Sequence, residues 1–261
     1  MANNNRIHED LYIAARALDE IHRMYGQNSL AHTSTKYQFL PQTTKRISEM
    51  MLREARDQER RNYRKFKRGS LVFVEFGVNV GKELSNRHWA VVLDKSDYVS
   101  KGTLTVVPVS SKKGFDAVKI DGAIADDPFS TIEKYLASSS KSVYFAFRSV
   151  EDSLTTPLSD ETISSIKFLH DRYGDEYDES NADEVNELFL VETMKKIIKI
   201  HKLITHYKRF QSESYAKCSN ITTISKDRII FINDMDPCGR FTVNDDTLDR
   251  IDQKVAELYI K

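Results

Sequence analysis

Five short runs rich in β-branched and aromatic residues constrain the fold of this chain most strongly. Each run is bounded by Gly, Ser, Asn or Asp, which is typical of β-strands joined by turns. They are Leu71–Phe76, Trp89–Leu93, Leu104–Val109, Ala117–Ile120 and Val143–Phe147, and Tyr215–Ser219 and Arg228–Ile232 repeat the pattern later in the chain. The sequence therefore predicts a sheet assembled from two separate parts of the chain.

Stretches with helical spacing of apolar residues surround these strands. The predicted helices are Ile7–Tyr25, Thr43–Lys67, a helix capped by Ser159 and ended by Gly174, a long helix through Leu188–Ile204, and a closing helix capped near Asn244. We therefore expect an α+β protein in four parts. These are an N-terminal helical extension (1–67), a first group of strands (68–150), a helical insertion (151–213), and the last strands with a C-terminal helix (214–261).

Composition excludes several classes of protein. Hydrophobic residues make up 40% and charged residues 30% of the 261 positions, which fits a globular protein. The formal net charge is zero, so any attraction to nucleic acid must come from local segregation of charge. Two cysteines, Cys218 and Cys238, are too few for a disulfide framework, and we expect a structural role for both. No apolar run approaches the roughly 18 residues that would span a bilayer, and the start Met1–Asn5 lacks the apolar core of a signal peptide. We expect a cytoplasmic protein without a membrane partner.

The segment from Phe66 to Lys113 carries the most informative pattern. Phe66–Gly77 places a basic residue and a glycine before an apolar strand, and Val78–His88 is a loop containing Gly-Lys-Glu. Trp89–Leu93 and Leu104–Lys112 then form two strands, the second ending in Ser-Ser. This succession resembles the PemK/MazF family of toxin endoribonucleases. Its members have a first strand after a basic-Gly pair, a glycine-acidic loop, a second strand that begins at Arg-Pro, and a third strand that ends in Thr-Ser or Ser-Ser.

A second part of the chain resembles the same family in the same order. Ile221–Ile229 is similar to its late strand pair, and Val243–Asp252 is similar to the start of its final helix. Pro157–Ile163 is also similar to the start of that final helix, so a barrel that ends near residue 157 is an alternative. The resemblance covers less than half of the chain and implies an SH3-like β-barrel with helical additions.

The resemblance implies an enzyme that cleaves single-stranded RNA without a metal or other cofactor. The 2′-hydroxyl would attack phosphorus and leave a 2′,3′-cyclic phosphate and a 5′-hydroxyl. That chemistry needs a base, an acid and donors that stabilise the charge on phosphorus. The family also implies pairing of two copies, an antitoxin protein as regulator, and a setting in a toxin–antitoxin system or in phage defence.

Three residues are candidates for catalysis. His88 stands where the family has its functional arginine, and its ordinary pKa of about 6.5 suits acid–base work near neutrality. Arg87 can supply a permanent positive charge to phosphate. Ser110 matches the functional Thr or Ser of the family; its alternative role is to cap the following turn. Trp89 stands where the family has proline, and we expect it in the core rather than as a base-stacking platform.

Five further residues are candidates for RNA binding. Lys82, Lys112 and Lys113 would hold the phosphate backbone as point charges, Glu83 matches the acid of the family loop, and Asn86 belongs to the same loop. The replacement of Arg-Pro by His-Trp leaves two alternatives open. One is a non-catalytic PemK-like module that binds protein or nucleic acid, and the other is a gyrase-directed toxin on a related barrel. His201 and His206 lack the spacing of a metal pair, and we interpret them as surface residues.

Overall fold

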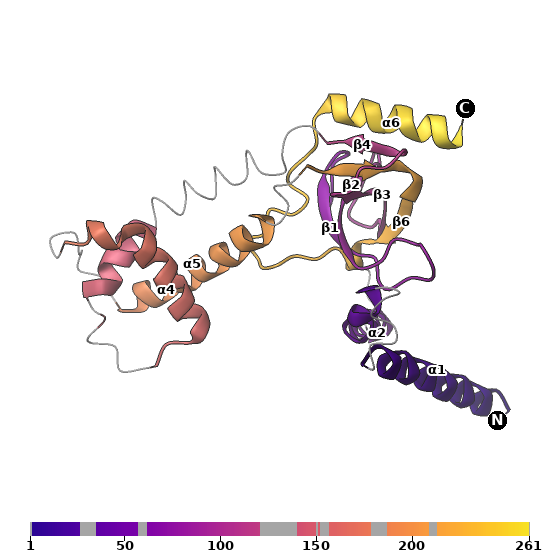
Figure 1. The fold of residues 1–261 in the computed structure, drawn as a ribbon, viewed down its shortest axis with the longest axis horizontal. Coiled ribbons are helices and arrows are strands. Elements are labelled where there is room, and N and C mark those ends of the chain that lie inside the picture. Colours follow the sequence, from indigo (N-terminus) through magenta and orange to yellow (C-terminus); the bar gives the residue numbers. More distant parts are fainter. Residues whose placement is uncertain are drawn as a thin grey trace.

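A computed structural model of the chain describes residues 2–26, 35–56, 62–120, 140–149, 151, 157–178, 187–208 and 213–260. Its strands are β1 (Leu71–Glu75), β2 (Arg87–Val92), β3 (Thr103–Ser110), β4 (Ala117–Lys119), β5 (Tyr215–Lys217) and β6 (Thr222–Ser225). Its labelled helices are α1 (Ala2–Gly26), α2 (Leu40–Arg56), α4 (Asp160–Tyr173), α5 (Glu187–Lys208) and α6 (Asp245–Tyr259), with short 3₁₀ turns η1 (Thr35–Phe39), η3 (Gly174–Glu176), η5 (Cys218–Asn220) and η6 (Lys226–Arg228). Figure 1 shows α6 above the sheet, α1 and α2 below it, and α4 and α5 extending to one side.

The strands form one antiparallel sheet in which β3 is central. The order is β1-β2-β3-β5-β4, and β6 also pairs with β3. The first half of β3 pairs with β6 through Leu104↔Ile224, and its last residues pair with β5 through Ser110↔Tyr215. The late strands therefore return to the early ones, as the sequence predicts.

The predicted α+β character is confirmed, and the sheet is antiparallel but does not close into the predicted barrel, whose SH3-like form stays a prediction. Among the described strands, the ladders leave β1 and β4 at the two ends of the path. The outer edge of β1 meets residues 229–243 only through the isolated bridges Val74↔Ile229 and Ser70↔Thr242 and a few hydrogen bonds, such as that from Ile230 N to Phe73 O (2.8 Å). An irregular segment with two turns covers this edge, so no continuous ladder closes the sheet.

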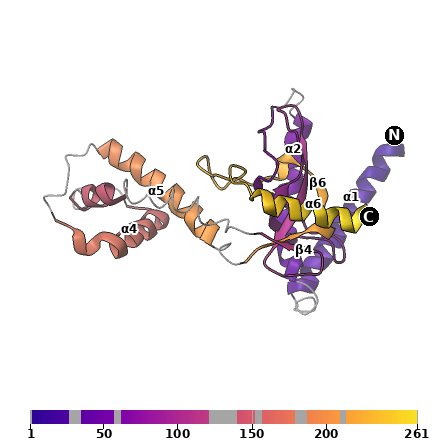
Figure 2. The same ribbon diagram turned by 90° about the horizontal axis from the view of Figure 1, so that it is seen from above.

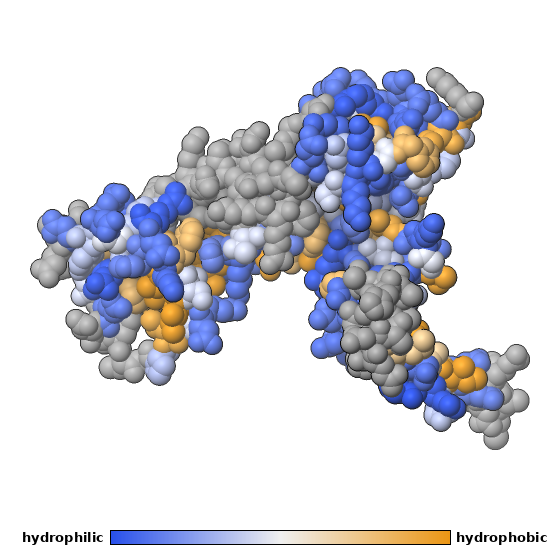
Figure 3. Space-filling view, in the orientation of Figure 1, coloured by the Kyte–Doolittle hydropathy of each residue, from blue (hydrophilic) through white to orange (hydrophobic). Residues whose placement is uncertain are grey.

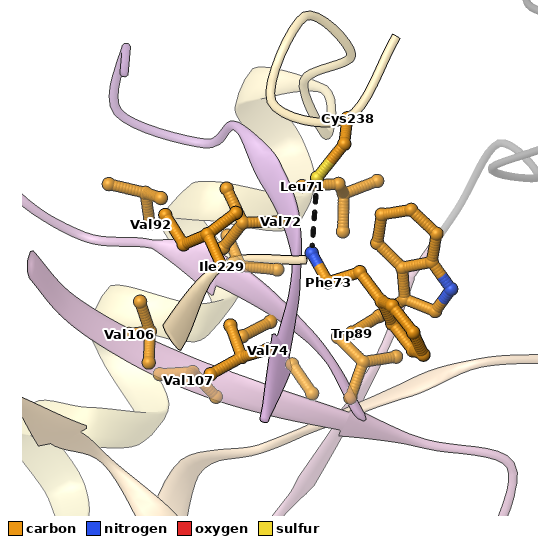
Figure 4. Close-up of a cluster of buried hydrophobic side chains, with 14 of the residues drawn as sticks. Leu71, Val72, Phe73, Val74, Trp89, Val92, Val106, Val107, Ile229 and Cys238 are labelled. Atoms are coloured by element: carbon orange, nitrogen blue, oxygen red, sulfur yellow. Dashed lines mark hydrogen bonds between the residues drawn. The ribbon is translucent and has the colours of Figure 1, made fainter. Parts of the chain in front are cut away.

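The main core lies within the curved sheet. Valines at alternate positions of β1 and from β2 and β3 are inaccessible to solvent, and Ile229 and Cys238 from the covering segment pack with them (Figure 4). Cys238 Sγ accepts a hydrogen bond from Phe73 N (3.3 Å), which fixes the covering segment to β1. Trp89 is 2% exposed and lies 5.2 Å from the ring of Phe73. The expected core position of Trp89 is therefore confirmed.

A second core joins three helical segments away from the sheet. Residues 140–149 are helical, and Val143–Phe147, predicted as a strand, is part of this helix. Its apolar residues pack with Leu169 of α4 and Ile197 of α5. All five residues of this run are buried, and a short apolar run does not by itself distinguish a strand from a buried helix. The division of the chain at residue 150 stays a prediction, although this packing favours an earlier change from sheet to helix.

Helix α5 connects the two cores. Its first half packs with α4, while Ile200, Leu203 and Tyr207 belong to the core of the sheet. Figure 2 shows α5 running from the helical group toward the sheet. The helical group formed by residues 140–149, α4 and α5 is consequently attached to the sheet by buried side chains as well as by its chain connections.

Several predicted helix boundaries are confirmed by their caps. Ser159 Oγ accepts from Thr162 N at 3.3 Å, and Asn244 Oδ1 accepts from Thr247 N at 2.9 Å. The predicted helix Thr43–Lys67 is confirmed only in its first part, because α2 ends at Arg56 and residues 62–67 form an irregular linker to β1. The predicted strand Arg228–Ile232 is also wrong: Arg228 ends the turn η6, and Ile229 makes only an isolated bridge.

Helix α1 extends away from the sheet and contacts mainly η1. Its side chains Leu11, Tyr12 and Ile13 are exposed, and apolar atoms are visible on this arm in Figure 3. Within the described part of the chain, no helix combines the length and apolarity needed to cross a membrane.

Candidate functional site

The loop between β1 and β2 is built around an unusual backbone conformation at Asn86. Its φ of 72° lies in the left-handed region, which asparagine tolerates better than most residues. Phe76 N donates to Asn86 O (2.9 Å), while Asn79 Nδ2 donates to Leu84 O (2.7 Å) and Asn79 N to Ser85 Oγ (3.0 Å). These bonds fix the turn of the chain immediately before Arg87 and His88.

A cavity of about 340 Å³ opens beside this turn. That volume falls within the range of about 300–1,000 Å³ common for ligand sites. Its lining combines residues of the sheet with residues of η1 and α2: Glu75, Asn86, Arg87 and His88 from the sheet side, and Phe39, Gln42 and Thr43 from the helical side. Three predicted site residues thus come together in one place.

Arg87 is held by a buried carboxylate. Arg87 pairs with Glu75 across the β1–β2 ladder, and its Nε donates to Glu75 Oε2 at 2.8 Å. The Glu75 side chain is 2% exposed, whereas that of Arg87 is 46% exposed. One edge of the guanidinium is therefore fixed to the protein, and its outer part reaches the cavity and solvent.

His88 follows on the opposite face of β2 and is half-buried. Its Nε2 lies 3.0 Å from Ser85 O, and its ring centroid is 6.3 Å from that of Phe76. Burial lowers the pKa of His88 below its ordinary value, while hydrogen bonding to the backbone of Ser85 and Val109 acts in the opposite direction. The imidazole is consequently mostly neutral at pH 7. A neutral ring has one N–H, so its second nitrogen can accept a proton.

Ser110 ends β3 at the same end of the sheet. Ala90 pairs with Pro108, and continuing this antiparallel register by two residues sets Ser110 opposite His88. Ser110 Oγ accepts from Lys112 N (3.2 Å), which is the turn-capping role considered from the sequence. Ser110 is half-buried and does not line the cavity.

The four charged loop candidates lie outside the cavity. Lys82 and Glu83 are exposed on the β1–β2 loop, and Lys112 and Lys113 are exposed on the β3–β4 loop. The carbonyl that His88 contacts belongs to Ser85, so the backbone of the loop orients the ring. The loops carry three positive charges near the cavity-bearing end of the sheet.

The helical wall of the cavity was missed by sequence reasoning. Thr43 of α2 is buried, and Lys36 of η1 donates from Nζ to Asn79 O (2.6 Å) and Gly81 O (2.7 Å) of the β1–β2 loop. Arg46, one turn further along α2, interacts electrostatically with Arg87 and Glu75. The signal for Glu75 was present in the sequence, because it is the one carboxylate within an otherwise apolar strand. The docking of α2 had no comparable signal.

Three secondary expectations have clear outcomes. Cys218 and Cys238 are both buried without a disulfide, and burial raises their pKa values to about 11 and about 12. His206, expected at the surface, instead packs edge-on against Phe73 with ring centroids 4.7 Å apart. In the described ranges, no group of three or more His, Cys, Asp or Glu side chains is arranged to hold a metal ion.

Comparison with known proteins identifies no relative: no protein-family model matches the chain, and no curated protein matches it significantly.

Proposed function

We propose that this chain is a toxin-like endoribonuclease that cleaves single-stranded RNA without a metal, in a toxin–antitoxin or phage-defence setting. The proposal includes a distant relation to PemK/MazF toxins, with an opened sheet in place of their SH3-like barrel. The observation that carries it is that the half-buried His88 imidazole and the Arg87 guanidinium, which leave opposite faces of β2, both line one cavity. The sequence resemblance around these residues supports the same function.

The proposed mechanism begins with proton removal from the 2′-hydroxyl by the unprotonated nitrogen of His88. The resulting oxygen attacks phosphorus, and the bond to the 5′-oxygen breaks as that oxygen takes a proton from water. His88 returns its proton to solvent, and the products carry 2′,3′-cyclic phosphate and 5′-hydroxyl ends. Arg87 stabilises the charge on the phosphoryl oxygens through the donors that Glu75 does not occupy. Ser110 would donate to a non-bridging oxygen if its hydroxyl turns from the β3–β4 turn toward His88.

End-mapping of RNA in EDTA tests this function. Wild type should produce cyclic phosphate ends, and His88→Ala should reduce the rate by about 10²–10⁴-fold, the usual contribution of a general base. Ser110→Ala should reduce the rate without changing the product ends. His170→Ala is the matched control, because His170 bonds Tyr144 within the helical core and should leave cleavage unchanged.

One observation favours a second function, a non-catalytic PemK-like module that binds nucleic acid or protein. The ion pair with Glu75 and the backbone contacts of His88 restrict both candidate groups. This alternative predicts that folded wild type binds RNA and leaves it intact. Folded protein that neither binds nor cuts RNA across many sequences contradicts the nuclease and the RNA-binding form of the alternative, and leaves only a protein-binding module.

A further inference from the structure

Helix α2 is docked against the β1–β2 loop through specific contacts. A Cβ added at Gly77 would lie 3.5 Å from Ile47 Cδ1 and 3.7 Å from Thr43 Cγ2, so the helix lies within one methyl group's reach of the loop. The two Lys36 hydrogen bonds to the same loop fix the start of the helix. Because α2 is held at the cavity in this way, its side chains form one wall of the cavity.

The helical face that reaches the cavity continues to a second arginine. Gln42 and Thr43 line the cavity, and Arg46 follows them by four and three positions, which places all three on one face of α2. Arg46 is half-buried, and its pKa is lowered by burial and by repulsion from Arg87, with Glu75 acting in the opposite direction. The half-buried Arg46 guanidinium therefore lies within electrostatic reach of the buried Glu75 carboxylate to which Arg87 is bonded.

The charge around the cavity is unbalanced. Arg46 interacts with two further positive charges, Arg87 and Arg53, and with two negative charges, Glu75 and Glu49, so the group keeps a net positive charge. Arg228 brings another guanidinium to the carbonyls of Glu75 (3.2 Å) and Phe76 (3.3 Å). Neutral carbonyls do not cancel this charge. An anion that enters the cavity would offset the repulsion between these guanidinium groups, which burial strengthens.

An uncompensated acceptor also points to a ligand. Asn86 Oδ1 is buried and has no hydrogen-bond partner in the described structure, although Asn86 lines the cavity. Buried polar atoms are nearly always paired, so this oxygen calls for a donor. A nucleotide unit combines a phosphate for the arginines with hydroxyl and amino donors that can bond polar groups of this turn.

We propose that a phosphodiester group of single-stranded nucleic acid binds between Arg46 and Arg87, which makes α2 part of the substrate site. The choice of ligand rests on the function proposed above. Guanidinium groups suit this role because they bind phosphate oxygens bidentately. The N-terminal extension is then required for substrate binding, and it is not a removable cover over the cavity.

Binding of a short fluorescein-labelled single-stranded deoxyoligonucleotide, measured by anisotropy in EDTA at several salt concentrations, tests this inference. The probe lacks the 2′-hydroxyl, so binding is observed without cleavage. Arg46→Gln should weaken binding about tenfold, and the slope of log affinity against log salt should become less negative by about 0.7, the value for one phosphate contact on a single strand. Arg56→Gln is the matched control, because Arg56 is exposed at the far end of α2 and the change in net charge is the same. Its affinity should fall by less than about twofold.

The outcomes separate this inference from the enzymatic function. Arg46→Gln that binds as wild type does, or more tightly, overturns the inference, and tighter binding would indicate a covering role for α2. Arg46-dependent binding by a wild type that does not cut RNA supports the inference and contradicts the nuclease. Wild type that cuts RNA while Arg46→Gln binds normally supports the nuclease alone. Folded wild type that binds no oligonucleotide overturns the inference.

Discussion

Replacement of Asp97 by Asn should destabilise the sheet strongly, because it removes one partner of a buried ion pair. Lys226 Nζ donates to Asp97 Oδ1 at 2.7 Å, and the two side chains are 2% and 1% exposed. The same groups hold the linker that joins α2 to β1: Lys226 Nζ also donates to Arg64 O (3.0 Å), and Asp97 Oδ2 accepts from Phe66 N (2.9 Å). The pair therefore connects the linker to η6.

The expected loss follows from what remains around Lys226. Breaking a buried pair by removing one partner typically destabilises by about 3–5 kcal/mol. In Asp97→Asn the ammonium keeps the Arg64 carbonyl, and it stays 5.9 Å and 5.8 Å from the ring centroids of Tyr63 and Phe66. Each such cation–π contact contributes about 0.5–2 kcal/mol. We therefore expect a loss near the lower end, about 3 kcal/mol in the free energy of unfolding.

Urea denaturation followed by the fluorescence of Trp89 measures this loss in the sheet, because Trp89 is the only tryptophan and lies in the sheet core. Lys254→Met is the control, since the Lys254–Glu257 pair is 30% and 46% exposed. It should change stability by less than about 1 kcal/mol. A loss below about 1 kcal/mol for Asp97→Asn would show that the buried pair contributes no more than an exposed one, and the reasoning would be wrong.

Three further outcomes are expected. The folded pKa of His88 is lowered, so the unfolded chain binds a proton at this residue first as pH falls below about 6.5. Wild type should therefore lose more stability between pH 7 and pH 5 than His88→Gln does, measured by urea midpoints, and equal losses would contradict this. The two buried cysteines should react with a disulfide reagent at pH 8 only on unfolding, because pKa values of about 11 and about 12 leave little thiolate; fast reaction of the native protein would contradict their burial. Gly239→Ala should destabilise the protein by more than about 2 kcal/mol, because the φ of Gly239 is +78° and the added Cβ would overlap the ring of Phe66. Gly81→Ala should destabilise it by only about 1 kcal/mol in the same denaturation measurement, because Gly81 has a φ of +58° and nothing within 4 Å of the added Cβ. Similar losses for the two variants would refute the steric argument.

The elements that the sequence predicted well are those with local signals. Ser159 and Asn244 cap their helices through side-chain bonds within one turn, and such bonds depend on neighbouring residues alone. The strands β1 to β4 were likewise bounded by turn-forming residues. Val143–Phe147 was assigned wrongly because five apolar residues fit a strand and a buried helix equally well, and only their contacts with α4 and α5 decide between them.

The candidate site was only half predictable for a related reason. Asn86, Arg87 and His88 are consecutive, so one motif located all three at the cavity. Arg46 lies about 40 residues earlier, and its approach to Arg87 depends on the docking of α2, which no local pattern encodes. The predicted barrel does not close for the same reason: the path of residues 229–243 along β1 is set by tertiary contacts, which no local pattern encodes.

The pairing of β4 with β5 has a consequence for how this chain reaches its native state. Lys119 pairs with Tyr215, so two adjacent strands are joined by a loop of about 95 residues. Closing such a loop is entropically less favourable than closing a four-residue turn by about 2.8 kcal/mol. If residues 140–149, α4 and α5 fold first, their ordered helices shorten the effective loop. Tyr207, at the end of α5 and a few residues before β5 in the chain, then packs beside Trp89. This helical group would then position β5 for pairing with β3 and β4, and folding would proceed from the middle of the chain outward.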